Sequence, residues 1–388
     1  MSAVLPERGA AAVDALVGVA SPDGLATPTA TATLDLSVVM PTYRRPDLLA
    51  RCLGALLAQT LPADRFEVIV VDDGQEDRCR EQVERVAATP GAPAIRYLRA
   101  ASGRGPAVAR NAGWRAATAP LVAFTDDDTL PDPAWLARGL AAMQAHPEWV
   151  AAAGQVRVPS ASASASGGAG GIGTATDGDG DGDIGRDGVP ARRDTRPTDH
   201  ELMTRGLETS EFVTANAFAR REVLARIDGF DERFLRAWRE DSDLQFRLQA
   251  QGPVGRVADA LVWHPVRPER WGVSLRQQRN VYFDALLYRK HPAIYRSRIR
   301  RVPPWDYYAI VAMTPAAIVL AAAGQGAIAA GLLAVSVALI LRLTARRLRA
   351  TSLALPHVWE MLCTSAAIPF LSVYWRLRGA WHFRTPFL

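Results

Sequence analysis

The stretch Leu121-Val122-Ala123-Phe124-Thr125-Asp126-Asp127-Asp128 runs from four apolar residues almost directly into three carboxylates. The apolar run predicts a buried strand, so the aspartates lie at its carboxyl end. Asp126 and Asp128 are two positions apart and point to the same side of extended backbone. Crowded carboxylates attract a cation, and oxygen ligands of this kind suit Mg²⁺ or Mn²⁺ held together with a substrate's phosphates. The alternative is an aspartate-rich turn closed by Pro131.

Two more strands with polar ends are predicted on the N-terminal side. Residues 34–40 end at Pro41-Thr42-Tyr43, and residues 66–71 end at Asp72-Asp73; a helix follows each strand. A short strand at 95–98 and a helix carrying Ala109-Arg110-Asn111-Ala112-Gly113 come before the aspartates. Alternating strands and helices predict a doubly wound, Rossmann-like α/β sheet. Ligands bind such sheets beyond the carboxyl ends of the strands, where all three polar ends are expected.

The second half of the chain adds a further acidic cluster. Arg239-Glu240-Asp241-Ser242-Asp243 is predicted to open a helix. Acidic residues in a first helical turn interact favourably with the helix dipole, so capping is the alternative role for Glu240 and Asp241. Residues 262–265 predict a strand end that carries His264, and residues 277–280 begin another amphipathic helix.

Composition excludes some classes of partner and site. The chain has 388 residues, a net charge of +5 and a single lysine, Lys290. It has no basic stripe with interleaved aromatic residues, so we expect no nucleic-acid partner. The three cysteines, Cys52, Cys79 and Cys363, are odd in number and far apart, which argues against a zinc site and a disulfide framework. We therefore expect the catalytic part to lie in a reducing cytoplasm.

Two segments have the composition of disordered chain. Residues 1–33 are predicted to be a mobile leader, and residues 160–199 a low-complexity disordered insertion within a domain spanning 34–295. The acidic repeat 177–183 resembles the start of a calcium loop. Position 12 of that loop would be Gly188 where a bidentate glutamate is needed, so calcium is not expected.

Residues 296–388 predict a membrane-associated helical region. Arginines precede Trp305, and the apolar run 308–341 is too long for one span and is divided at Gly324-Gln325-Gly326. We expect a hairpin with both ends on the cytoplasmic side of the cell membrane, since a single span would place its following arginines outside. A buried globular helix pair is the alternative. Residues 353–374 are expected to lie in the membrane interface or to re-enter the membrane rather than to span it.

Six motifs in order make residues 34–290 resemble a family-2 glycosyltransferase with the GT-A fold, of the membrane-anchored bacterial type. They are Val-Val-Met-Pro-Thr-Tyr at 38–43, Val-Val-Asp-Asp-Gly at 70–74, Ala-Arg-Asn-Ala-Gly at 109–113, Phe-Thr-Asp-Asp-Asp at 124–128, Gly-Phe-Asp-Glu-Arg-Phe at 229–234 and Glu-Asp-Ser-Asp-Leu at 240–244. The insertion departs from the family pattern. Gln277-Gln278-Arg279-Asn280 matches the QxxRW signature of processive members only loosely, so no polymerase is inferred.

The resemblance implies a donor site with a metal. Asp126 and Asp128 match the family's DxD motif, with Asp128 on the metal and Asp126 on the ribose or the metal. His264 would complete the metal site, or else be a structural histidine. Arg110 would neutralise the nucleotide side of the donor, or else be a helix-surface arginine. The other donor-binding residues implied are Pro41, Thr42 and Tyr43 for base and ribose, Asp72 or Asp73 for the base, and Asp127.

The resemblance also implies the acceptor side. Asp241 would be the general base, since a sugar hydroxyl is a poor nucleophile and a nearby carboxylate takes its proton. Glu240 would orient it or contact the acceptor. Asn216 and Trp238 would shape the sugar and acceptor pocket. Inverting members of the family use a single displacement, for which one base is sufficient.

The sequence therefore predicts an inverting, metal-dependent glycosyltransferase at the cytoplasmic membrane face. Its donor would be a nucleotide-diphosphate sugar, and its acceptor a lipid-linked or cell-envelope glycan. Nucleotidyl transfer is an alternative, although Pro41-Thr42-Tyr43-Arg44-Arg45 lacks the glycines of a phosphate loop. A non-catalytic membrane scaffold is the other alternative, and the retained aspartates argue against it.

Overall fold

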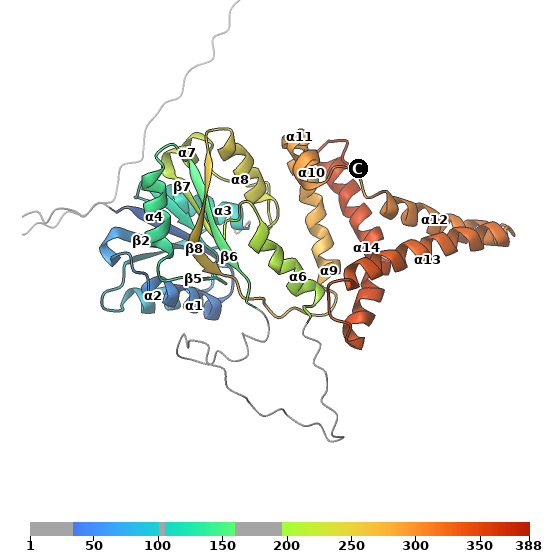
Figure 1. Cartoon of the computed structure of the whole chain (residues 1–388), viewed down its shortest axis with the longest axis horizontal. Helices are drawn as coiled ribbons and strands as arrows, with labels where there is room; N and C mark the ends of the chain where they lie inside the picture. The colour runs from blue at the N-terminus through green and yellow to red at the C-terminus, as the bar shows by residue number, and fades with distance from the viewer. Residues whose placement is uncertain (1–33, 101–104, 160–195) are drawn as a thin grey trace, which may run out of the picture. The chain divides into compact units, whose positions relative to one another are not determined.

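The stretch Leu121–Phe124 forms β4, inside a mixed sheet of eight strands with the order β3-β2-β1-β4-β7-β6-β8-β5 (Figure 1). The structure is a computed structural model that describes residues 34–100, 105–159 and 196–388. The predicted leader, the acidic repeat at 177–183 and most of the predicted insertion lie outside the described residues.

One half of the sheet is parallel, which agrees with the alternation of strands and helices predicted from the sequence. Strands β1 (Leu36–Thr42), β2 (Phe66–Asp72) and β3 (Ala94–Arg99) pair in parallel, and β4 joins the other side of β1. Thr42 and Asp72 are register partners at the last positions of β1 and β2. The predicted α/β fold is confirmed, and the polar strand ends gather at one edge of the sheet.

The other half of the sheet brings distant segments to the same edge. Strand β7 (Ala217–Arg220) pairs antiparallel with β4 and with β6 (Ala151–Arg157), which pairs in parallel with β8 (Val254–Trp263). The short β5 (Leu130–Pro131) pairs antiparallel with the end of β8, where Leu130 is opposite Trp263. This pairing places His264 beside the aspartates that precede β5.

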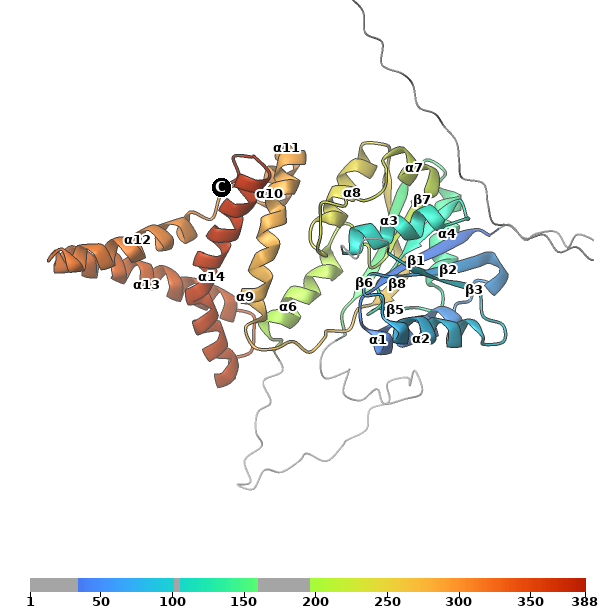
Figure 2. The same ribbon diagram turned by 180° about the vertical axis from the view of Figure 1, so that it is seen from behind.

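Helices cover both faces because successive strand residues point to opposite sides. On one face, Val38 and Met40 of β1 pack with α1 (Pro46–Leu57), α2 (Asp77–Ala87) and α4 (Trp135–Ala145). On the other face, Val39 packs with α3 (Pro106–Ala116), α7 (Arg221–Arg226) and α8 (Glu240–Gln249). Figures 1 and 2 show α1 and α2 on one side of the sheet and α3 on the other. Gly113 lets α3 approach closely, since a Cβ there would lie 2.3 Å from Val39 Cγ1.

A short helix begins inside the range that was predicted to be insertion. Helix α6 (Asp199–Arg205) starts with a capping box, in which Thr198 Oγ1 accepts from the Glu201 amide and the Glu201 carboxylate accepts from the Thr198 amide. A 3₁₀ turn, Gly206–Thr209, follows it. The capping box satisfies the free amides at the start of the helix, so regular structure begins at the predicted end of the insertion.

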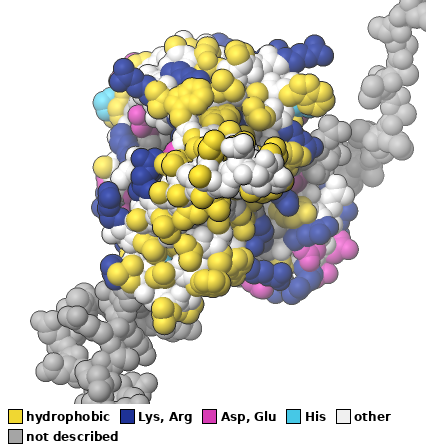
Figure 3. All heavy atoms as spheres, turned by 90° about the vertical axis from the view of Figure 1, so that its right-hand side faces the viewer, with side chains coloured by type: hydrophobic (Ala, Val, Ile, Leu, Met, Phe, Trp, Pro, Cys, Tyr) yellow, Lys and Arg dark blue, Asp and Glu magenta, His cyan; other side chains and the backbone are white. Residues whose placement is uncertain are grey.

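The C-terminal region is helical. It contains α9 (Val273–Gln277), α10 (Val281–Lys290), α11 (Pro292–Ile294), the turn Tyr295–Ile299, α12 (Trp305–Ala322), α13 (Gly326–Leu348) and α14 (Leu355–His382). Helices α12 and α13 pack together as the predicted hairpin, joined through Gly324 at φ 78°. Both are long and apolar enough to cross a membrane by length and composition, and they are largely exposed. Figure 3 views the molecule from the side of these helices and shows apolar side chains across that surface, with Lys and Arg along its flanks.

The C-terminal helices share a hydrophobic core with α8 and the loop before it. Phe234 and Phe246 pack in one cluster with Phe283 of α10, and with Phe383 and Phe387. The predicted domain boundary at 295/296 therefore passes through a packed core. Residues on both sides of that boundary depend on the same buried aromatic side chains.

Candidate active site

Arg110 joins the two groups of acidic residues that the sequence singled out. Its buried guanidinium donates from Nη2 to Asp126 Oδ1 at 2.6 Å and from Nη1 to Glu240 Oε1 at 3.1 Å. The Phe230 ring lies 5.7 Å from the guanidinium carbon. Helix α3 places Arg110 between the end of β4 and the start of α8, so the residues predicted for the donor and for the acceptor lie next to each other.

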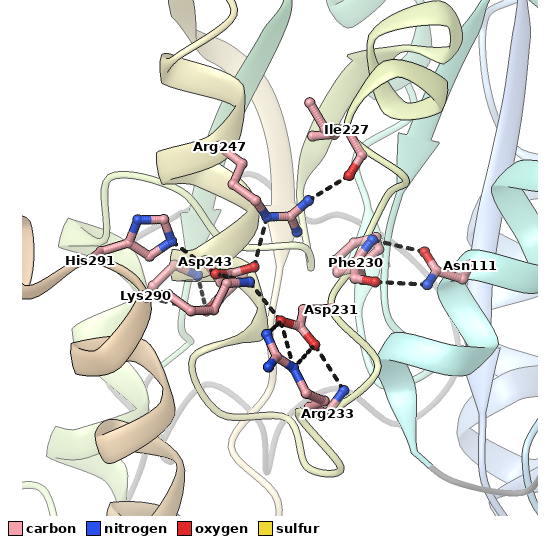
Figure 4. A network of polar contacts seen from close by, with 11 residues as sticks. Asn111, Ile227, Phe230, Asp231, Arg233, Asp243, Arg247, Lys290 and His291 are labelled. Atoms are coloured by element: carbon pink, nitrogen blue, oxygen red, sulfur yellow. Dashed lines mark hydrogen bonds and ion pairs between the residues drawn. The ribbon is translucent and has the colours of Figure 1, made fainter. Parts of the chain in front are cut away.

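The neighbouring Asn111 holds the loop that precedes α8. Its Nδ2 donates to the Phe230 carbonyl at 2.9 Å, and its Oδ1 accepts from the Phe230 amide at 2.8 Å (Figure 4). The Arg-Asn pair of the 109–113 motif thus has two tasks, because Arg110 binds the carboxylates while Asn111 fixes the backbone beside them.

Two arginines outside the predicted set neutralise the aspartates after β4. Arg45 Nη1 lies 3.3 Å from Asp127 Oδ1 and 3.8 Å from Asp128 Oδ2, and Arg267 Nε lies 3.1 Å from Asp128 Oδ2. Thr42 Oγ1 also donates to Asp127 Oδ2 at 2.8 Å. Burial raises the pKa of Asp127 to about 6, although the charge of Arg45 opposes that rise. In the sequence, Arg45 is one residue of the polar stretch Tyr43-Arg44-Arg45, and nothing there indicates that it contacts the aspartates.

Of the predicted metal ligands, Asp128 and His264 are the two that lie side by side. His264 Nε2 lies 3.7 Å from Asp128 Oδ1, and its buried Nδ1 has no hydrogen-bond partner among the described residues. Asp126 is less suited, because Oδ1 is already bonded to Arg110. No group of three or more His, Cys, Asp or Glu side chains in the described chain is arranged to hold a metal. The remaining ligands would have to come from elsewhere, as when Mg²⁺ is held partly by substrate phosphates.

The two aspartates at the end of β2 have different surroundings. Asp72 is buried, and its oxygens accept from the amides of Gly74, Gln75 and Glu76 and from Tyr97 Oη, at 2.7–3.0 Å. Asp73 Oδ2 accepts from the Gly105 amide at 2.8 Å, while its buried Oδ1 has no partner among the described residues. Burial also raises the pKa of Asp73. Asp72 therefore builds the turn, and Asp73 offers the free acceptor.

Pro41 and Thr42 are the last residues of β1, and Tyr43 follows with a ring that is 49% exposed. The Arg44 guanidinium carbon lies 5.3 Å from the centre of that ring. An accessible aromatic ring beside a strand end is suited to stack on a planar group. Pro41, Thr42 and Tyr43 thus lie where the sequence placed them, at the same edge as Asp73.

The carboxylates at the start of α8 are poorly compensated. Glu240 is buried, and its Oε2 has no partner among the described residues. Asp241 is partly exposed and accepts from the Ser242 amide at 2.7 Å. Burial, and then repulsion by Asp241, raises the pKa of Glu240 to about 8, against the opposing charge of Arg110. Burial also raises the pKa of Asp241, while Arg110 and Arg239 oppose it.

Asp284 of α10 fixes the residues just before these carboxylates. Its Oδ1 accepts from Arg239 Nε at 2.7 Å and from Trp238 Nε1 at 3.0 Å, and its Oδ2 accepts from Tyr295 Oη at 3.1 Å. Arg239 has a left-handed backbone, with φ 74°. Asp284 was not predicted, because nothing in its local sequence indicates a partner so far along the chain.

Asn216 does not lie where the sequence prediction placed it. Its side chain is fully buried, accepts from Trp135 Nε1 at 2.8 Å, and donates to the carbonyls of Gln155 and Ala260 at 3.0 and 2.8 Å. These bonds tie together the strands β6 and β8 and helix α4. The structure therefore does not bring Asn216 to the acceptor pocket, whereas Trp238 remains partly exposed beside Arg239.

The acidic residue two positions after Asp241 belongs to a structural network. Asp243 is buried and pairs with Arg247 at 2.8 Å, Lys290 at 2.6 Å and His291 at 2.9 Å. Lys290 also reaches Asp231 at 2.6 Å, as Figure 4 shows. This network fastens α8 to the end of α10, which keeps the Glu240-Asp241 pair in place.

Comparisons with known proteins indicate the family. Residues 37–227 match the model for glycosyl transferase family 2, and residues 195–375 match glycosyl transferase family group 2. Validoxylamine A glucosyltransferase of Streptomyces hygroscopicus subsp. jinggangensis is 31% identical over 274 residues, which are 67% of this chain and 61% of that protein. Chondroitin synthase of Escherichia coli is 28% identical over 301 residues, 70% of this chain and 42% of that protein. The chain thus spans less than two thirds of either relative.

A solved structure has the same fold. The mannosyltransferase PcManGT from Pyrobaculum calidifontis, in complex with GDP-Man and Mn²⁺, superimposes with a TM-score of 0.53 at 22% identity. The match covers 91% of this chain and 88% of that one, in agreement with the predicted GT-A fold. From the motifs, the sheet and these matches together, the chain belongs to glycosyl transferase family 2.

Proposed function

We propose that the chain transfers a sugar, with inversion, from a nucleotide-diphosphate donor to an acceptor hydroxyl. The observation that carries this proposal is the position of Arg110 between Asp126 and Glu240. The buried Arg110 guanidinium binds both groups, so it holds the aspartates after β4 next to the acidic start of α8. A donor bound at the first group would thus present its sugar to the second.

The donor side would bind the diphosphate and a metal. Asp128 and His264 would hold Mg²⁺ or Mn²⁺, which stabilises negative charge on the departing diphosphate. Arg45 and Arg267, now paired with Asp128, are the cations nearest to such a diphosphate. Asp73 would accept from the base through its free Oδ1, and Tyr43 would stack on the base. The GDP-Man and Mn²⁺ bound to PcManGT support this choice of ligands.

The acceptor side would supply the base. As the acceptor oxygen bonds to the anomeric carbon, the bond from that carbon to the diphosphate oxygen breaks. Asp241 takes the hydroxyl proton, and a nucleoside diphosphate leaves. A carboxylate whose pKa is raised towards neutrality is a stronger base, provided that the pH keeps it ionised. Glu240 would orient Asp241, and Trp238 would line the acceptor pocket.

We further propose that the acceptor is a lipid-linked or cell-envelope glycan at the cytoplasmic face of the cell membrane. The exposed apolar helices α12 and α13 support membrane association, and arginines lie at both open ends of the hairpin. A C-terminal tag that is protected from protease in right-side-out vesicles, and cleaved in inverted ones, would support this orientation. The opposite pattern would refute it.

A donor screen with product analysis tests the reaction. Nucleotide sugars are added to the purified chain with and without Mn²⁺, and the melting temperature is measured, since a bound donor stabilises the fold by mass action. Turnover should release a nucleoside diphosphate. In parallel reactions with a nucleoside triphosphate and a sugar 1-phosphate, release of pyrophosphate would instead indicate nucleotidyl transfer. No shift with any donor would favour a non-catalytic scaffold.

A further inference from the structure

A buried arginine of α14 has no counter-ion among the described residues. Arg376 is 2% exposed, and its Nε and Nη1 have no hydrogen-bond partner in the described chain. The Phe387 ring lies 4.5 Å from its guanidinium carbon, and no ion pair of Arg376 is found among the described residues. A buried charge without a partner is costly, because it loses water and gains no opposite charge in return.

The buried carboxylate of Asp284, in the adjoining core, already has hydrogen-bond donors on both oxygens. Tyr295 lies within the electrostatic influence of both Asp284 and Arg376. However, both oxygens of Asp284 are taken by Trp238, Arg239 and Tyr295. An anion from outside the described chain would accept hydrogen bonds from the Arg376 guanidinium. It would leave intact the ion pair between Asp284 and Arg239, which lies beside the proposed base.

A second unused donor lies on α12, the helix that packs against α14. The hydroxyl of Tyr308 is buried, has no hydrogen-bond partner among the described residues, and is subject to the charge of Arg376. Tyr308 belongs to the first turn of α12, and its ring lies 5.7 Å from that of Trp305. A tryptophan and a tyrosine at the start of an apolar helix are typical of the level of lipid headgroups. Tyr308 therefore lies at the level expected of a headgroup, on a helix that packs against α14.

We propose that Arg376 and Tyr308 bind the phosphate group of a membrane lipid between α12 and α14. Phosphate oxygens accept hydrogen bonds from a guanidinium and a phenol, and arginine matches their geometry well. Arg296 adds positive charge to the same aromatic cluster, since it stacks on Tyr288, whose ring lies 5.3 Å from that of Phe387. Basic pockets between membrane helices are known to bind anionic headgroups. The proposal rests on the proposed membrane association of α12 and α13.

Two sources of this phosphate are chemically equivalent at Arg376. One is an anionic phospholipid of the surrounding bilayer, and the other is a phosphate that links a lipid to the acceptor glycan. The second source would place the acceptor close to the catalytic groups, because Tyr295 and Asp284 connect the surroundings of Arg376 to Arg239, the residue before Glu240.

Lipid binding to the purified full chain in neutral detergent tests the site. The probes are farnesyl phosphate, farnesol, dioctanoyl phosphatidylglycerol, dioctanoyl phosphatidylcholine and inorganic phosphate, with native mass spectrometry as the readout. We expect the wild-type chain to bind at least one lipid phosphate about tenfold more tightly than its neutral or zwitterionic counterpart. Arg376→Gln should remove this preference, and Tyr308→Phe should reduce it about threefold.

Arg378→Gln is the matched control. Arg378 lies on the same helix, but it is exposed and contacts Tyr374 Oη and the Trp375 ring. Equal losses in Arg378→Gln and Arg376→Gln would overturn the site, as would unchanged lipid preference in Arg376→Gln and Tyr308→Phe. If Arg376→Gln fails to fold, Tyr308→Phe decides alone, since it removes a single oxygen.

The probes separate the two sources. Preference for farnesyl phosphate over phosphatidylglycerol supports a lipid-linked substrate, and equal binding supports a bilayer lipid. Binding of inorganic phosphate alone, or of no probe, overturns the proposal. Donor binding with Mn²⁺ is measured on the same variants. An intact donor response without a lipid response would refute the lipid site and leave the proposed transferase function standing.

Discussion

The two acidic groups joined by Arg110 differ in how fully their charge is compensated. Arg110, Arg45 and Arg267 each contact the aspartates after β4, so each of those three carboxylates has a cation beside it. At the start of α8, Arg110 is the one cation paired with Glu240, and Asp241 accepts only from Ser242 among the described residues. The two acidic groups of one site are therefore compensated to different degrees.

The difference indicates a division of labour. In the proposed site, a divalent metal would take the place of the arginines on the aspartates, and those arginines would then pair with the diphosphate. An undercompensated and partly buried pair holds protons more tightly, which is the property a general base needs near neutral pH. Variants that remove one carboxylate or one cation should separate these roles.

The largest effect is expected from Asp241→Asn. It should lower kcat by about a hundredfold to ten-thousandfold, because the hydroxyl proton has no acceptor, while the donor-induced thermal shift with Mn²⁺ stays as in wild type. Steady-state release of nucleoside diphosphate measures the rate. Ser242→Ala is the control, since it keeps the amide that bonds to Asp241 and should retain near-normal turnover. Wild-type kcat in Asp241→Asn would refute the base assignment.

Asp128→Asn should act on the other group. Donor affinity in the presence of Mn²⁺ should fall by about a hundredfold, as expected for loss of a metal-supporting carboxylate. Titration calorimetry with and without the metal measures this change. Asp64→Asn, at an exposed position before β2, should bind as wild type does. If Asp128→Asn keeps full Mn²⁺-dependent affinity, the metal lies elsewhere.

Arg110→Met should shift the dependence of rate on pH. The proposed mechanism requires an ionised Asp241, and the charge of Arg110 lowers the pKa of both Glu240 and Asp241. Without that charge both pKa values rise further, so the acid limb of kcat/KM moves to higher pH and activity recovers in alkali. Arg115→Met, an exposed arginine of the same helix, serves as the control. An equal loss at every pH would instead indicate a purely structural role.

The smallest effect is expected from Asp284→Asn. Arg239 would lose its ion pair, and with it the fixed position from which its charge lowers the pKa of Asp241. We expect kcat/KM at neutral pH to fall by less than about tenfold, with a small shift of the acid limb in the same direction. A pH-rate profile that coincides with wild type would show that Asp284 does not act through Arg239.

The fold was largely predictable because its signals are local. The apolar runs and polar turns located β1, β2, β3 and β4 to within two residues, and Gly324 located the turn of the hairpin. Helix α6 was missed although Thr198 and Glu201 form a capping-box pattern, because the low-complexity composition around them dominated the interpretation.

The site was predictable as a set of motifs but not as a set of contacts. Spacing identified Asp126, Asp128 and Asp241, yet nothing local shows that Arg110 bridges two of the motifs, or that Arg45 and Arg267 face Asp128. Asp72 and Asn216 carry the same side-chain chemistry as binding residues. Only the folded chain shows that their hydrogen bonds are used internally, by a turn and by neighbouring strands.

The shared aromatic core has a consequence for the order of events during synthesis. Phe383 and Phe387, which pack on Phe234 and Phe246, come later in the chain than α12 and α13. The ribosome therefore completes the hairpin before it supplies the side chains that finish the core beside the proposed base. On the proposed membrane association, the hairpin would therefore be available to the bilayer before the core beside Asp241 is complete.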